Sequence, residues 1–105
     1  MSPEALSKMA EVFKAFADGT RLGIIQSLKE GPRTVSELHE ELGTSQANIS
    51  KHLRILHDQS ILSREKRGMQ VFYAVDDKIV FPLCELICSK LNEEQAEKVK
   101  FNFAI

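Results

Sequence analysis

The chain has 105 residues, of which 43% are hydrophobic and 28% are charged. This length suits one globular domain with a single core. No apolar run reaches the roughly 18 residues of a membrane span, and no signal peptide precedes the charged N-terminal segment, so we expect a soluble, cytoplasmic protein. Two cysteines make no disulfide scaffold. Three histidines, one tyrosine and no tryptophan leave little for a catalytic pocket, so we expect no enzyme activity.

The net charge of −1 conceals an uneven distribution. Residues 44–75 hold five Lys or Arg against two Asp or Glu, whereas the segments on either side are each net acidic. A basic middle between acidic flanks suggests one cationic face on a nearly neutral protein. Such a face favours a polyanionic partner, although an excess of three charges is small enough to arise by chance.

Two helices are predicted in the first third of the chain. The first begins with Ser2 as its cap and Pro3 in the first helical position, and it continues to about Asp18. Its apolar residues recur at intervals of three and four, which predicts one buried face made of Leu6, Met9, Val12, Phe13 and Phe16. The second helix is predicted from about Thr20 to Lys29.

The next two helices are predicted to form a helix-turn-helix over about residues 34–58. Thr34 followed three residues later by Glu37 is a capping box, which predicts the start of a short helix that ends at Gly43. Thr44 or Ser45 then caps a further helix that continues through about residue 58. Two helices joined by so short a link have the spacing of a helix-turn-helix.

After residue 58 the periodicity changes from helical to extended. Segments 61–66 and 70–75 flank a short link, and the second is rich in β-formers, which predicts a β-hairpin over about 61–75 with Gly68 at its turn. A last helix is predicted to start at Asp77 or Val80, with Pro82 near its start, and to run to about Leu91. The tail is predicted to add a turn or two over 93–100.

The predicted order is therefore α-α-α-α-β-β-α, a mostly α fold with a β-hairpin wing. The helix-turn-helix comes immediately before the hairpin, which is the arrangement of a winged helix. In that fold one helix enters the major groove and the hairpin reaches along the adjacent backbone.

The helix predicted after residue 44 has two contrasting faces. Ile49, Leu53 and Leu56 share the core-facing side. The opposite side and its flanks carry small, amide and basic groups, which can pair with base edges and phosphates. These candidate DNA-binding residues are Thr44, Ser45, Gln46, Ala47, Asn48, Ser50, Lys51 and Arg54. His52 lies nearer the core, as a hydrogen-bonded packing residue between the two helices.

The predicted wing adds three candidate DNA contacts, Arg64, Lys66 and Arg67, which would meet phosphates or a minor groove. One polar helix face by itself is more often an ordinary solvated surface. Here a capped short helix, a two-residue link, a polar-basic helix and a basic hairpin occur together in the right order. This combination favours binding to double-stranded DNA.

Several of these segments resemble the ArsR/SmtB family of bacterial repressors. They are Thr34-Val-Ser-Glu-Leu-His, Thr44-Ser-Gln-Ala-Asn-Ile-Ser-Lys-His-Leu-Arg-Ile-Leu, the hairpin segment from Ile61, and Lys14-Ala-Phe-Ala-Asp-Gly-Thr-Arg. The last is similar to the family's helix junction, although aspartate-proline is more usual there than Asp18-Gly19. The resemblance covers about residues 8–91. It implies a homodimer that represses transcription at a palindromic operator until an inducer releases it from the DNA.

A dimer also has a physical rationale. One wing and one recognition helix make few contacts, and a two-fold dimer doubles them at half-sites about one helical turn or more apart. The first and last helices, over about 3–18 and 80–103, are strongly apolar. We therefore expect them to form the dimer interface.

The resemblance also implies two kinds of metal site, and this chain departs from both. Where the family has cysteines on the helix before the recognition helix, the matching residues here are Thr34, Ser36 and His39. Where it has an inter-subunit zinc-type site on the last helix, the matching residues look like Asp77, Ile79, Lys90 and Glu93. Ile79 cannot ligate a metal and Lys90 adds a positive charge, so we expect neither site.

Cys84 and Cys88 remain as the candidate effector site, one turn apart on the last predicted helix. Thiols at i and i+4 share a face, where both sulfurs could hold one soft metal or a trivalent arsenical. If Pro82 starts the helix, Cys84 lies in the first turn, where the helix dipole lowers a thiol pKa. A thiol-redox or reactive-sulfur switch is a second interpretation. Inert packing is a third, because both cysteines fall within an apolar stripe.

Two other functional hypotheses stay open. One is a winged-helix DNA-binding dimer without a small-molecule site, controlled by abundance or by a protein partner that binds the apolar tail. The other is a winged-helix module that binds protein rather than DNA. The basic residues Lys51, Arg54 and Arg67 disfavour the latter.

Overall fold

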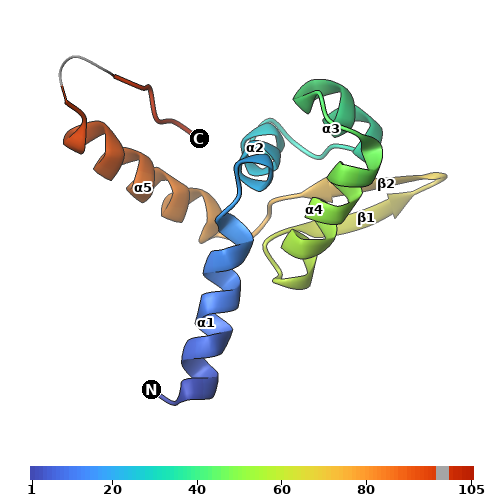
Figure 1. Cartoon of the computed structure of the whole chain (residues 1–105). Coiled ribbons are helices and arrows are strands. Elements are labelled where there is room, and N and C mark those ends of the chain that lie inside the picture. Colours follow the sequence, from blue (N-terminus) through green and yellow to red (C-terminus); the bar gives the residue numbers. More distant parts are fainter. Residues whose placement is uncertain (97–99) are drawn as a thin grey trace.

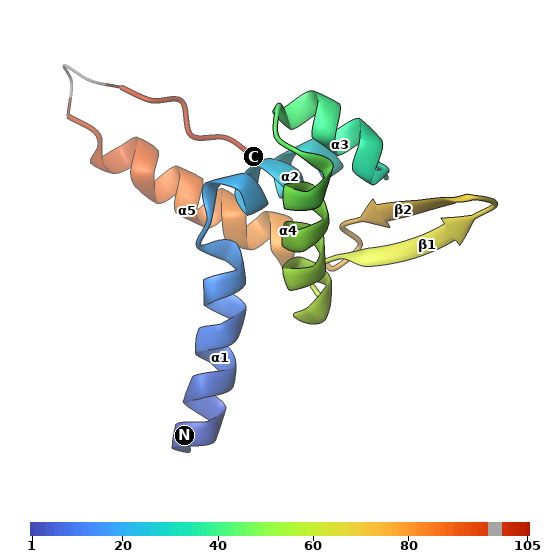
Figure 2. The ribbon, with the colours of Figure 1, turned by 45° about the vertical axis from the view of Figure 1, so that its right-hand side comes forward.

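The computed structural model describes residues 1–96 and 100–105. Its elements follow the order α1 (Pro3–Phe16), α2 (Gly19–Leu28), α3 (Val35–Leu42), α4 (Gln46–Asp58), β1 (Ser63–Arg67), β2 (Gln70–Ala74) and α5 (Val80–Glu94). Helices α2, α3 and α4 form the body, and the hairpin projects from one side of it (Figure 1). Helices α1 and α5 extend from the body in other directions, as the turned view also shows (Figure 2). The predicted element order is confirmed.

Side-chain caps set the start of the first two helices. Ser2 caps α1 by accepting the main-chain N–H of Ala5 at 3.1 Å, and Pro3 occupies the first turn, as predicted. The prediction that this helix reaches Asp18 is wrong, because α1 ends at Phe16. Asp18 adopts extended backbone angles and accepts the N–H of Arg21 at 3.1 Å, so it caps α2 instead.

The helix-turn-helix forms as the sequence predicts. Both halves of the capping box are present: Thr34 accepts the N–H of Glu37, and the Glu37 carboxylate accepts the N–H of Thr34. Gly43 ends α3 with a φ of 69°, a left-handed conformation that favours glycine. Ser45 rather than Thr44 caps α4, and its hydroxyl accepts the N–H of Asn48.

The core lies where α2, α3 and α4 meet. Its largest fully buried side chains are Ile24, Ile25, Leu38, Ile49, Leu53 and Leu56. Each such burial stabilises the fold by about 1.5–3 kcal/mol before entropy is counted. The predicted core face of α4 is therefore confirmed.

The hairpin is an antiparallel pair with Ser63 opposite Ala74 and Arg67 opposite Gln70. Gly68 sits at the turn with a φ of 61°. The first strand begins two residues later than predicted, because the main-chain N–H of Ile61 still donates to the Leu56 carbonyl near the end of α4 at 3.0 Å. Ile61 and Leu62 are buried and belong to the core.

A main-chain bridge that the sequence did not suggest ties the hairpin to the body. The N–H of Arg33 donates to the carbonyl of Tyr73 at 3.0 Å, and the N–H of Tyr73 donates back at 2.8 Å. Because Arg33 directly precedes the cap of α3, this bridge fixes the wing relative to the helix-turn-helix.

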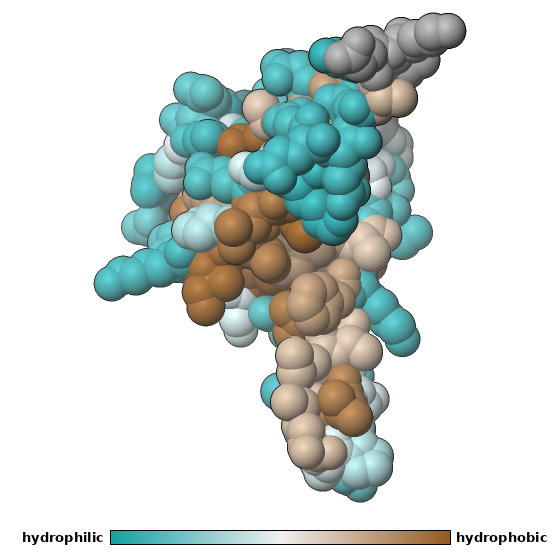
Figure 3. Space-filling model, turned by 90° about the vertical axis from the view of Figure 1, so that its left-hand side faces the viewer, coloured by the Kyte–Doolittle hydropathy of each residue, from teal (hydrophilic) through white to brown (hydrophobic). Residues whose placement is uncertain are grey.

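The apolar face predicted to be buried on α1 is largely exposed within this chain. Leu6, Met9 and Phe13 are 53%, 46% and 57% exposed, and Ala15 is the one buried residue of the helix. The prediction fails because α1 projects away from the body, so few of its side chains meet another element (Figure 2). Figure 3 shows hydrophobic side chains gathered where this helix joins the body, with further ones along it.

Helix α5 begins at Val80, without a side-chain cap of its own. It ends at Glu94. The sequence predicted a further turn or two of helix over 93–100, and residues 97–99 of that segment lie outside the described part of the chain. The last residues run back toward the body: Asn92 bonds both main-chain groups of Phe103, and Gln26 of α2 donates to the carbonyl of Ala104 at 3.2 Å. Among the described residues, no helix is long and apolar enough to cross a membrane.

Candidate DNA-binding surface

Helix α4 turns most of the predicted contact residues away from the core. Its buried side is made of Ile49, His52, Leu53 and Leu56. The exposed candidates on and just before this helix are Ser45, Gln46, Ala47, Ser50, Lys51 and Arg54. Two cations, an amide and small hydroxyl or methyl groups thus share one uncovered surface.

Thr44 and Asn48 are less available than the sequence suggested, because both are half-buried. The Asn48 side-chain amide donates to the Thr44 hydroxyl at 3.0 Å, and a ring nitrogen of His39 contacts the Thr44 carbonyl. These contacts fix the turn between α3 and α4. Both residues therefore help to shape the start of α4.

The three predicted wing cations do not form one cluster. Side chains alternate between the two faces of a strand, so Arg64 and Lys66 share one face of β1 and Arg67 lies on the other. Arg67 is paired with Glu65 at 3.0 Å and stacks over Phe72, with 4.9 Å from its guanidinium carbon to the ring centre. All three cations are exposed, but Arg67 already has partners within the wing.

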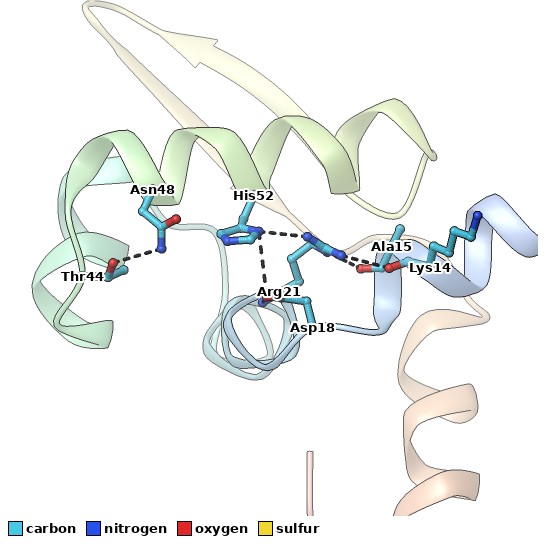
Figure 4. A network of polar contacts seen from close by, with 7 residues as sticks. All are labelled: Lys14, Ala15, Asp18, Arg21, Thr44, Asn48 and His52. Carbon is cyan, nitrogen blue, oxygen red and sulfur yellow. Dashed lines mark hydrogen bonds and ion pairs between the residues drawn. The ribbon is translucent and has the colours of Figure 1, made fainter.

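His52 is buried, as predicted, but its hydrogen-bonding partner lies on α2 rather than on α3. Its Nδ1 is 3.0 Å from an Arg21 guanidinium nitrogen and 3.8 Å from the Asp18 carboxylate (Figure 4). Burial lowers the pKa of His52, while the carboxylate of Asp18 acts in the opposite direction. The backbone N–H of Arg21 lowers the pKa of Asp18. Sequence reasoning missed this contact, although its residues stand in two of the segments that resemble the ArsR/SmtB family.

Comparison with known proteins places this geometry in a family. Residues 18–64 match the model described as bacterial regulatory protein, arsR family. An uncharacterized HTH-type transcriptional regulator of Methanocaldococcus jannaschii is 42% identical over 78 residues, which are 72% of this chain and 88% of that protein. The chain belongs to the ArsR family. Its winged-helix fold and its relatives are those of DNA-binding transcriptional regulators, not of enzymes.

Two further comparisons extend this assignment. The arsenical resistance operon repressor of Bacillus subtilis is 36% identical to this ArsR-family chain over 88 residues, which are 81% of this chain and 84% of that protein. The solution structure of a homodimeric winged helix-turn-helix DNA-binding domain from Mycobacterium bovis superposes with a TM-score of 0.78. It is 25% identical and covers 96% of this chain and 95% of that one. The predicted family and winged-helix fold are thus confirmed.

The two cysteines of this ArsR-family protein line a cavity that is partly open to solvent. The cavity has a volume of about 540 Å³ and is lined by the end of α1, by α2, by α5 and by the last residues of the chain. Cys84 is 5% exposed and Cys88 is half-buried, and both are free thiols. Leu83, Ile87 and Leu91 accompany them on the same wall.

The prediction that the helix dipole lowers the pKa of Cys84 is wrong. Helix α5 begins at Val80, so Cys84 lies beyond the first turn, where the dipole acts most strongly. Burial instead raises the pKa of the Cys84 thiol. Cys84 is therefore a protonated thiol at neutral pH in this structure.

The positions that match the family's metal sites hold groups with other roles. Thr34 caps α3, the Asp77 carboxylate accepts the N–H of Ile79 at 2.7 Å, and Lys90 pairs with Glu94 one turn along α5. Within residues 1–96 and 100–105, no three His, Cys, Asp or Glu side chains stand close enough to hold a metal ion.

Proposed function

We propose that the protein is a homodimeric repressor that binds a palindromic operator, with α4 in the major groove and the wing on the adjacent backbone. The exposed polar and basic face of α4 carries this proposal. Lys51 and Arg54 suit guanine edges or phosphates, Gln46 suits an adenine edge, and Ala47 suits a thymine methyl group. The main-chain N–H groups at the start of α4, next to Ser45, suit a phosphate oxygen.

The exposed apolar faces of α1 and α5 support a dimer. On α5, Leu86 and Ile87 are 68% and 51% exposed, which adds to the uncovered Leu6, Met9 and Phe13 of α1. Apolar surface of this extent is costly to leave in water and marks an interaction surface. The M. bovis neighbour is a homodimer. We propose that segments 3–18 and 80–103 form the dimer interface of this protein. Residues 97–99 of the second segment lie outside the described part of the chain.

We propose further that an inducer acts at Cys84 and Cys88 and releases the dimer from DNA. Two thiols one turn apart on one cavity wall suit a soft metal or a trivalent arsenical, and they also suit a reactive sulfur species or an oxidant. The cavity touches both α1 and α5, so an adduct there would disturb the proposed interface. Only an inducer that binds the released state more tightly could shift the equilibrium.

The burial and raised pKa of Cys84 favour a second candidate function. A protonated, 5% exposed thiol behaves as a small hydrophobic side chain. In that case the protein is a winged-helix DNA-binding dimer without a small-molecule site, controlled by abundance or by a protein partner.

Removing Arg64 and Lys66, the two wing cations that share one face of β1, tests the proposed contact between the wing and the DNA backbone. The double variant Arg64→Ala, Lys66→Ala is expected to weaken binding to a DNA duplex selected from a random library and to an unselected duplex alike, because wing contacts to phosphate carry no sequence information. The slope of log affinity against log salt should fall by about one unit for each phosphate that the wing no longer neutralises. Fluorescence anisotropy across a salt series measures both quantities.

Arg67→Ala is the matched control, because Arg67 lies on the opposite face of the wing and already pairs with Glu65. It should change the salt slope less than the double variant does. An unchanged slope in the double variant, or an equal change in the control, would contradict the proposed wing contact.

A further inference from the structure

The Arg21 side chain joins three helices. Its Nε donates to the carbonyl of Ala15 at 2.7 Å, and one terminal nitrogen donates to the carbonyl of Lys14 at 2.9 Å, both at the end of α1. The other terminal nitrogen is 3.0 Å from Nδ1 of His52 on α4. Every nitrogen of this planar fork is therefore used, so the guanidinium holds α1, α2 and α4 in one arrangement (Figure 4).

This contact fixes the protonation state of His52. A guanidinium can only donate hydrogen bonds, so Nδ1 of His52 must accept and its ring hydrogen lies on Nε2. An imidazolium has no acceptor, so protonation of His52 would break the bond to Arg21. It would also set a second positive charge beside the guanidinium.

Three charged groups act on the His52 ring. Asp18 and Arg21 face it from α2, and Lys51 is its neighbour on α4. Asp18 favours the protonated ring, whereas Arg21, Lys51 and burial oppose it. The neutral form that accepts from Arg21 is therefore the form present at neutral pH.

The link meets α4 next to its proposed DNA-reading residues. His52 follows Lys51 directly and precedes Arg54 by two positions. The apolar side chains Ile49, Leu53 and Leu56 hold the helix on the core, but apolar contacts are non-directional. A directional polar bond can select one rotation of the helix about its axis.

We propose that Arg21 is a positioning residue for the recognition helix, which holds α4 in the orientation that specific DNA binding requires. This inference rests on the proposed function, because it takes α4 as the DNA-reading element. Phosphate contacts tolerate a small rotation of α4, whereas contacts to base edges do not. The link should therefore matter for the ratio of specific to non-specific affinity rather than for DNA binding in general.

The variant Arg21→Lys tests this directly, because it keeps the charge but cannot bridge three acceptors from a fixed fork. The measured quantity is the ratio of affinities for a library-selected duplex and an unselected duplex. We expect this ratio to fall about tenfold, with affinity for the unselected duplex changed by less than about twofold. An unchanged ratio in a variant that melts and elutes like the wild type would overturn the inference.

The variant His52→Asn tests the same link should Arg21→Lys fail to fold. Asparagine offers an acceptor at the place of Nδ1 but does not titrate. Because the pKa of His52 is lowered, the wild-type ratio should hold at neutral pH and fall as the pH drops below about 6.5, whereas the His52→Asn ratio should stay constant. Parallel pH profiles for both proteins would overturn the inference. If the wild type selects no duplex at all, the proposed function itself fails, which is a separate outcome.

Discussion

Replacing Lys51 and Arg54 together with glutamate is expected to abolish sequence-specific DNA binding while the fold stays intact. Both side chains are exposed on the outward face of α4, so their removal takes away no core packing. Each interaction with a base or phosphate that is removed costs about 1–3 kcal/mol, and the new carboxylates repel the backbone. We expect the affinity for a library-selected duplex to fall by at least about 100-fold.

A second double variant, with the same change in net charge but at positions outside α4, shows whether the loss of affinity depends on where the charges lie. Lys29 follows α2 and Lys78 lies before α5; both are exposed, and neither belongs to α4, to the wing or to the proposed dimer segments 3–18 and 80–103. Replacing these two with glutamate should weaken binding only through the long-range field, which salt screens. Anisotropy titrations at two salt concentrations compare the pairs. Equal reductions in affinity from both pairs would show that α4 is not the reading surface.

Replacing Cys84 and Cys88 together with serine is expected to abolish the response to an inducer without weakening operator binding. The cysteines lie on α5 and do not belong to the proposed DNA-reading residues of α4, but they line the cavity that the end of α1 shares. Serine hydroxyls neither bind soft metals nor react with trivalent arsenic or oxidants as thiols do. Duplex release by the double variant should therefore be absent at inducer concentrations that empty the wild-type complex.

The probes for this experiment are cadmium chloride, a trivalent phenylarsenical and hydrogen peroxide, each added to the wild-type and variant complexes. Because Cys84 is buried, a Cys84→Ala, Cys88→Ala variant serves as a second test that introduces no buried hydroxyl. Equal release of wild type and variants would remove the cysteines from the mechanism. Failure of all three probes on the wild type would favour the alternative without a small-molecule site.

Local signals explain why most of the fold could be predicted from the sequence. The caps Ser2, Thr34 and Ser45 and the left-handed Gly43 depend on residues within one turn of each helix end, so a short segment determines them. The core face of α4 follows from its spacing alone. Asp18 was the exception, because an aspartate at this position can either end α1 or cap α2. In the structure its backbone is extended and its side chain caps α2.

Non-local contacts explain what the sequence could not supply. Periodicity marks an apolar face on α1, but it does not say which element covers it, and within this chain Phe13 stays exposed. The bonds from Arg21 to His52 and from Arg33 to Tyr73 join residues 31 and 40 positions apart, and no spacing rule predicts them. The pKa of Cys84 depends on the start of α5 and on burial, and both became known only from the structure.

The most direct test of the central claim is the architecture of the DNA sites that the wild-type protein selects from a random library, together with the mass of the complexes it forms on them. If two copies of α4 and two wings read DNA about a two-fold axis, the selected sites should be inverted repeats. Their half-site centres should lie about one helical turn, or a multiple of it, apart. Each site should hold two chains of 11.9 kDa. Enrichment of a single unrepeated motif held by one chain, or no enrichment, would contradict the account.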